Sequence, residues 1–214
     1  IFRRHIRITT TPTEAHADVE DDFHRFGVDI VHDGAKLVQV MGRELRTPWN
    51  TCRHPGGMLK VLNGASLRDN PTDFSRQQDS RLHSTPMYQL VAPASGLILR
   101  QVSRRDYETE APYPIGAETH AVLRRDGEEY LHWIVSRDPT VPKDDFATAY
   151  KSDTIISPTP FAGQRVTMLM PWAKDNLDAD MYEATYVLRR AVGLSTARFL
   201  DLDTPEYAHP KGMI

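Results

Sequence analysis

The chain has 214 residues, of which 40% are hydrophobic and 26% are charged, the composition of an ordinary globular protein. The formal net charge of -3 gives no electrostatic reason to expect nucleic acid or an anionic membrane as a partner. A single cysteine, Cys52, excludes an intramolecular disulfide framework, and no apolar run approaches the roughly 20 residues of a membrane span. We therefore expect a cytoplasmic protein without a secretory leader.

The N-terminal part of the chain predicts consecutive antiparallel strands. Residues 2–9 alternate between apolar and polar types, as a half-buried strand does. The segments 15–24 and 27–32 read as a hairpin, and an Asp-Gly pair at 33–34 separates it from a further strand at 35–41. Asp-Gly supplies the positive φ angles that a tight primed turn requires, so three or four antiparallel strands are expected here.

The middle of the chain predicts helices and a loop. Residues 55–64 indicate a short helix that ends at Gly64, and the polar residues 65–80 indicate a surface loop. The apolar segment 82–99 contains two prolines, at positions 86 and 93, and is therefore expected to be a broken helix.

The second half repeats the alternation of strands and helix. A second Asp-Gly pair at 126–127 predicts another hairpin turn, and 139–153 is expected to be a loop. Leu177 and Asp178 open a helix with an acidic cap and an apolar spacing that is helical. The predicted elements are strands at 104–110, 117–125 and 128–135, a helix at 177–193 and a closing strand at 195–202.

These elements predict an α+β fold of antiparallel β-hairpins and sheets packed with a few helices. We expect one domain over residues 1–214. Both halves contain an Asp-Gly turn, a Thr-Pro-aromatic triplet and a helix that ends in glycine, so two related lobes at 1–100 and 101–214 are the alternative. A duplication would place a cleft between two hairpin-plus-helix units.

The chain also resembles a bacterial family known only as a domain of unknown function, DUF2889. The resemblance covers nearly the whole chain and lies in Arg3-Arg4-His5-Ile6-Arg7-Ile8, Glu20-Asp21-Asp22-Phe23-His24, Val31-His32-Asp33-Gly34, Pro48-Trp49-Asn50-Thr51-Cys52, Ser157-Pro158-Thr159-Pro160-Phe161-Ala162-Gly163 and Val187-Leu188-Arg189-Arg190-Ala191. The family pattern has a Cys-Thr-His-Leu run where this chain has Ser84-Thr85-Pro86-Met87. A metal or thiol role for that run is therefore not expected here, and the resemblance implies a bacterial origin without implying an activity.

Several kinds of chemistry lack their motifs. The nine histidines include no His-x-His or His-x-x-x-His spacing, and Cys52 with His54 would supply only two of the ligands that zinc requires. A phosphate-binding glycine loop and a serine nucleophile elbow are also missing. We therefore predict neither a metal nor a nucleotide cofactor.

The cluster Glu20-Asp21-Asp22-Phe23-His24 is the best candidate for general acid-base chemistry. On a strand, Glu20, Asp22 and His24 share one face, so Asp22 and His24 are positioned to share a proton. The alternative is that these side chains bond to neighbouring strands or face water. The predicted catalytic residues are Asp22, His24, Glu20, His83 and Tyr88.

Aromatic residues and methionines in the middle of the chain suit a flat apolar ligand, although core packing also explains them. The predicted substrate-binding residues are Trp49, Arg46, Met87, Tyr107 and His132. The leading hypothesis is a cofactor-independent lyase or isomerase that acts by general acid-base catalysis on a small aromatic or phenolic bacterial metabolite, within aromatic catabolism. The alternative is a non-catalytic ligand-binding or assembly protein whose charged hairpin forms a homodimer interface.

Overall fold

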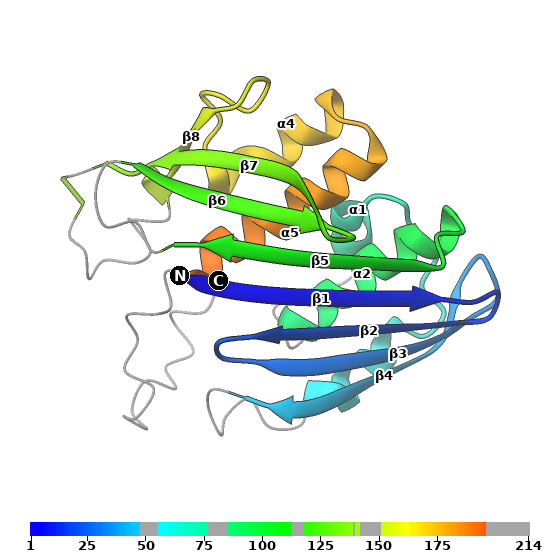
Figure 1. The fold of residues 1–214 in the computed structure, drawn as a ribbon. Helices are drawn as coiled ribbons and strands as arrows, with labels where there is room; N and C mark the ends of the chain where they lie inside the picture. The colour runs from blue at the N-terminus through cyan, green and yellow to red at the C-terminus, as the bar shows by residue number, and fades with distance from the viewer. Residues whose placement is uncertain (48–54, 77–84, 113–117, 139, 142–150, 196–214) are drawn as a thin grey trace. The chain divides into compact units, whose positions relative to one another are not determined.

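The computed structural model describes residues 1–47, 55–76, 85–112, 118–138, 140–141 and 151–195 (Figure 1). Its strands are β1 Phe2–Thr10, β2 Glu14–Asp21, β3 Arg25–His32, β4 Leu37–Arg46, β5 Arg104–Ala111, β6 Glu118–Arg125, β7 Glu128–Ser136 and β8 Thr154–Ser157. Its helices are η2 Pro55–Leu62, α1 Pro71–Arg76, α2 Thr85–Leu99, η4 Val166–Met168, α4 Leu169–Asn176 and α5 Ala179–Ser195, where η denotes a 3-10 helix.

The strands form one antiparallel sheet in the order β4-β3-β2-β1-β5-β6-β7-β8. This sheet, together with the helices, confirms the predicted α+β class. No helix in the described part of the chain is long and apolar enough to cross a membrane.

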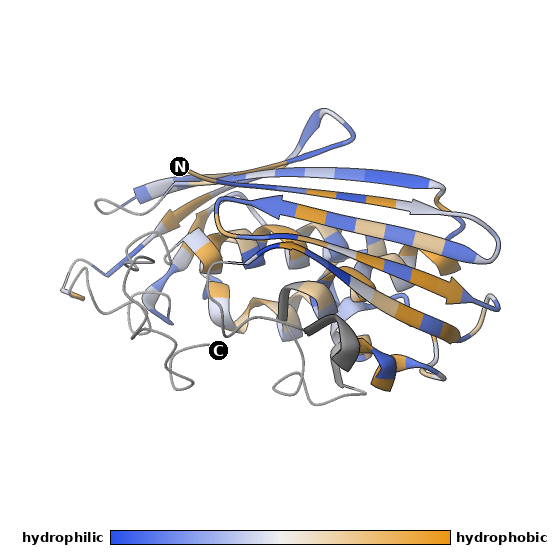
Figure 2. Ribbon diagram, turned by 90° about the horizontal axis from the view of Figure 1, so that it is seen from below, coloured by the Kyte–Doolittle hydropathy of each residue, from blue (hydrophilic) through white to orange (hydrophobic). Residues whose placement is uncertain are grey.

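Hydrophobic and hydrophilic residues alternate along the strands, as the striping in Figure 2 shows. In β2 the buried positions are Ala15, Ala17, Val19 and Asp21, every second residue. Successive side chains of a strand point to opposite faces, so this spacing places one face of β2 in the core. A carboxylate, Asp21, therefore occupies the last core-facing position of an otherwise apolar series.

The chain divides into two compact units, one formed by His5–Tyr107 and the other by Ile1–Arg4 together with Glu108–Ile214. The lobes expected at 1–100 and 101–214, and their common origin, stay predictions. The two units are described separately below.

In the unit His5–Tyr107, helix α2 packs against β2 and β3. The prediction of a broken helix was wrong, because Thr85–Leu99 is one helix with Pro93 inside it. Pro86 is compatible with the helix because it lies in the first turn, where a backbone N–H has no helical partner to lose. The helix buries Met87, Leu90, Val91, Ala94 and Leu97, and this packing holds it across Pro93. The loop predicted at 65–80 also contains the short helix α1.

In the unit with Glu108–Ile214, helix α5 packs against β6 and β7. Asp178 caps α5 as predicted, because its carboxylate accepts a hydrogen bond of 2.8 Å from the Met181 backbone N–H. Helix α4 was not predicted. The closing strand predicted at 195–202 is wrong at its first residue, since Ser195 ends α5, and its remaining residues lie outside the described ones.

The two Asp-Gly pairs make different turns. Asp126 and Gly127 both have positive φ, 54° and 92°, as the predicted primed turn between β6 and β7 requires. In the Asp-Gly pair that precedes β4, Gly34 has a positive φ and Asp33 does not. There the Asp33 side chain accepts hydrogen bonds from the backbone N–H groups of Ala35 and Lys36, at 2.8 and 2.7 Å, so a side chain closes the turn.

Candidate functional site

The candidate site lies at the turn between β2 and β3, in the unit His5–Tyr107. Strand β2 ends at Asp21, whose backbone N–H donates to the carbonyl of His24 over 2.9 Å. The Asp21 Oδ1 atom accepts the backbone N–H groups of Phe23 at 2.9 Å and of His24 at 2.8 Å. An aspartate that binds the backbone two and three residues later closes a turn by itself, so the chain reverses over 22–24.

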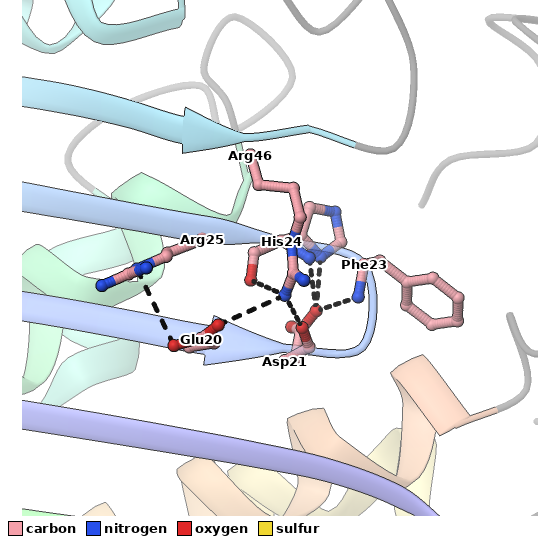
Figure 3. Close-up of polar contacts among 6 residues, drawn as sticks. All are labelled: Glu20, Asp21, Phe23, His24, Arg25 and Arg46. Carbon is pink, nitrogen blue, oxygen red and sulfur yellow. Dashed lines mark hydrogen bonds and ion pairs between the residues drawn. The ribbon is translucent and has the colours of Figure 1, made fainter.

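The same carboxylate oxygen binds the His24 ring (Figure 3). His24 Nδ1 lies 2.9 Å from Asp21 Oδ1, and the two side chains are 7% and 0% exposed. The ring packs against Phe26, with ring centroids 5.4 Å apart, and meets Phe23 edge-on at 6.1 Å. Among the residues that the structure describes, Nδ1 is the only ring atom of His24 with a hydrogen-bond partner.

This arrangement sets the tautomer of His24. An ionised carboxylate only accepts hydrogen bonds, so the His24 nitrogen that faces Asp21 is the one that carries a proton. In a neutral imidazole the other nitrogen, Nε2, then has the free lone pair and is the basic atom. The pair is therefore a buried Asp-His dyad with its base at Nε2.

The prediction that Glu20, Asp22 and His24 share one strand face was wrong. That prediction assumed an extended strand up to His24, in which residues two apart share a face, but Asp22 and His24 lie in the turn and Asp22 is exposed. The carboxylate that lies against His24 Nδ1 is that of Asp21. The signal in the sequence was the series Ala15, Ala17, Val19, whose next member with the same period is Asp21.

Glu20 and Arg46 lie beside the dyad without joining it. Glu20 is exposed and forms long ion pairs with Arg46, at 3.6 Å, and with Arg25, at 3.7 Å. Arg46, which lies opposite Arg25 in the β3–β4 register, directs its Nη2 to the carbonyl oxygens of Asp21 and His24. The guanidinium thus binds both ends of the turn and remains half exposed.

The other predicted site residues are buried in the unit His5–Tyr107, belong to the other unit or lie outside the described residues. Tyr88 is buried, and its hydroxyl donates to the Phe74 carbonyl over 3.2 Å. Met87 and Tyr107 are buried as well, in agreement with the core-packing alternative. His132 lies on β7 in the other unit. His83 and Trp49 lie outside the described residues, as do Cys52 and His54.

A second Asp-His pair lies on the exposed face of the same hairpin. His16 Nδ1 is 2.7 Å from Asp29 Oδ1, and these side chains are 50% and 23% exposed. Arg43 bonds Asp29 at 2.8 Å and Asp18 at 3.0 Å, so the pair belongs to a solvated charge network. The two pairs share contact chemistry and differ in burial, which makes His16 a matched control for His24.

Within the described residues, no group of three or more His, Cys, Asp or Glu side chains is arranged to hold a metal ion. No protein-family model and no curated protein sequence matches the chain. The resemblance to DUF2889 therefore stays a prediction.

Proposed function

We propose that the protein is a cytoplasmic lyase or isomerase in which His24 is the general base, oriented by Asp21, and acts without a cofactor on a small aromatic or phenolic metabolite. The observation that carries this proposal is the buried hydrogen bond of 2.9 Å between His24 Nδ1 and Asp21 Oδ1. A carboxylate that fixes one imidazole nitrogen and leaves the other as a base is the arrangement that general-base catalysis uses.

The proposed step is removal of a proton from a substrate carbon by His24 Nε2. The imidazolium that forms has both ring N–H groups, one of which donates to Asp21, so the carboxylate stabilises the new positive charge. An isomerase returns this proton to a different substrate atom, whereas a lyase transfers it to the group that leaves. Low exposure of both side chains strengthens the charge interaction relative to one in water.

Arg46 supports the choice of a phenolic or carboxylated aromatic substrate. Its guanidinium is fixed at the same turn and carries a permanent positive charge that suits a phenolate or carboxylate. The rings of Phe23 and Phe26 line His24 with apolar surface.

The first experiment is a thermal-shift screen of small phenolic and other aromatic metabolites, repeated with a chelator. Compounds that stabilise the protein are then incubated with it in deuterated water, and exchange of the substrate C–H is followed by proton NMR. We expect His24→Gln to slow the exchange by about 100-fold or more. The control His16→Gln, in the exposed pair, leaves the exchange rate unchanged.

The variant Tyr88→Phe tests the catalytic role that the sequence predicted for Tyr88. Since the Tyr88 hydroxyl bonds a core carbonyl, its loss is expected to cost about 1 kcal/mol of stability and to leave the exchange rate unchanged. Exchange that continues at the wild-type rate in His24→Gln refutes the proposal. A screen without any aromatic hit refutes the substrate class.

A second candidate function is assembly into a homodimer through strand β4, which pairs with β3 of the charged hairpin. Strand β4 is at the end of the sheet order, and three of its apolar side chains, Val38, Met41 and Leu45, are 54%, 42% and 59% exposed. Apolar side chains on an edge strand favour pairing with another chain. Light scattering on wild type and Leu45→Lys tests it: a dimer that the variant dissociates supports assembly, and a wild-type monomer excludes it.

A further inference from the structure

Two histidines face each other on neighbouring strands of the unit with Glu108–Ile214. His120 is on β6 and His132 on β7, and in the register His120 lies opposite Ile134 while His132 lies opposite Val122. His120 Nδ1 is 2.9 Å from His132 Nε2, and the ring centroids are 5.1 Å apart. Both side chains are accessible, with His132 39% exposed.

A carboxylate lies next to the outer nitrogen of the pair. Glu129 Oε1 is 3.5 Å from His132 Nδ1, so the carboxylate favours a proton on Nδ1. The lone pair of His132 is then on Nε2, the atom that faces His120. Metal-binding histidines in proteins are commonly oriented by such a carboxylate on the nitrogen that does not bind the metal.

We propose that His120 and His132 form a two-histidine chelating site for a divalent first-row transition metal, with Glu129 as the positioning residue. A metal-nitrogen bond is about 2.0–2.1 Å long, so two nitrogens at a right angle around one ion lie about 2.9 Å apart, and two at the tetrahedral angle about 3.4 Å apart. The observed 2.9 Å fits adjacent positions of a square-planar or octahedral ion.

This geometry favours Cu²⁺ and Ni²⁺ over Zn²⁺, which prefers tetrahedral sites. The exposure of both rings leaves the remaining coordination positions to water. A hydrogen bond between the two imidazoles is the competing explanation of the same distance, and it predicts no metal affinity beyond that of a single surface histidine.

The test is calorimetric titration of the full chain with CuCl₂, NiCl₂ and ZnCl₂, separately, in a buffer that does not bind metals. We expect wild type to bind Cu²⁺ most tightly, then Ni²⁺, then Zn²⁺. His120→Gln and His132→Gln each weaken the site by at least about tenfold, and Glu129→Gln weakens it less. His16→Gln is the matched control, because His16 is an exposed histidine paired with a carboxylate instead of a second histidine.

Stoichiometry separates this site from the histidines at 54, 83 and 209, which lie outside the described residues. The double variant His120→Gln/His132→Gln is expected to lose one equivalent of bound metal while its far-UV circular dichroism stays that of wild type. In NMR spectra, Cu²⁺ broadens the signals of Val122 and Ile134 first. An unchanged stoichiometry in the double variant, or Zn²⁺ binding tighter than Ni²⁺, overturns the proposal.

Discussion

The ion pair between Arg137 and Asp153 makes the sharpest stability prediction. Arg137 directly follows β7 and Asp153 directly precedes β8. The guanidinium binds the carboxylate through two contacts, Nε to Oδ1 at 2.8 Å and Nη2 to Oδ2 at 3.0 Å, and the side chains are 7% and 0% exposed. A buried pair of this kind is costly to break, because one charge remains in the protein interior without its partner.

The two single variants are expected to differ. Asp153→Ala leaves a buried guanidinium that cannot lose its proton, so the free energy of unfolding falls by about 3–5 kcal/mol. Arg137→Met leaves a carboxyl group that relieves its burial by taking up a proton. Burial already raises the pKa of Asp153 in the wild type, although Arg137 partly offsets the rise.

The sign of the pH dependence follows from this difference. In Arg137→Met the folded pKa of Asp153 lies above its unfolded value, so between the two values the folded protein holds more protons than the unfolded chain. The free energy of unfolding therefore falls as pH rises through this window, by up to about 1.4 kcal/mol per pH unit.

Urea denaturation at several pH values between about 4 and 8 measures both effects. Glu110→Ala is the control, because it breaks the exposed pair with Arg3, at 3.1 Å and with side chains 34% and 71% exposed, and should cost less than about 1 kcal/mol. The double variant Arg137→Met/Asp153→Leu should recover most of the loss. The reasoning fails if Asp153→Ala costs no more than Glu110→Ala.

Two further predictions concern a charge cluster and two glycines. Burial raises the pKa of Asp106. Hydrogen bonds from Arg104, Arg7 and His5 outweigh this effect and hold the pKa of the carboxyl group below its ordinary value of 3.8. Asp106→Asn should therefore lower the free energy of unfolding by about 1 kcal/mol at neutral pH, and the difference should shrink as the pH falls below 3.8 and disappear once it has passed the lower folded pKa. Gly127→Ala should lower the melting temperature, because Gly127 has φ of 92°. Gly27→Ala should lower the melting temperature less in the same scan. The atoms nearest to the added Cβ, at 2.6 Å, are the ends of the Arg43 and Asp18 side chains, which are able to move apart at the cost of an exposed ion pair. A larger loss at Gly27 than at Gly127 contradicts this argument.

Local signals in the sequence were sufficient for strands β1 to β7 and several of their ends, whereas β8 was not predicted. The Asp-Gly pair at 126–127 defined a hairpin because the positive φ of both residues is a property of the pair itself. Asp178 marked the start of α5 in the same way, through its own side chain. Features that depend on tertiary contacts were missed: α2 continues through Pro93 because its side chains are buried, and no local pattern reports that burial.

The prediction of the candidate site was wrong by one residue for a related reason. Asp21 and Asp22 are the same residue type, and the alternation of β2 alone does not say at which of them the strand ends. The turn begins where Asp21 captures two backbone N–H groups, an event that alternation does not report. The contact between His120 and His132 was likewise beyond reach, since the register across two strands sets it.

The role of Asp21 in the turn and its role toward His24 use the same oxygen, which decides how the proposed mechanism must be tested. Asp21→Ala removes the acceptor of three hydrogen bonds at once, so loss of activity would follow from loss of the turn alone. Asp21→Asn keeps one side-chain oxygen that accepts the same donors, removes the negative charge and replaces the second oxygen with an NH₂ group. If Asp21 stabilises the His24 imidazolium, Asp21→Asn retains the fold and loses deuterium exchange; if it only closes the turn, the variant retains both.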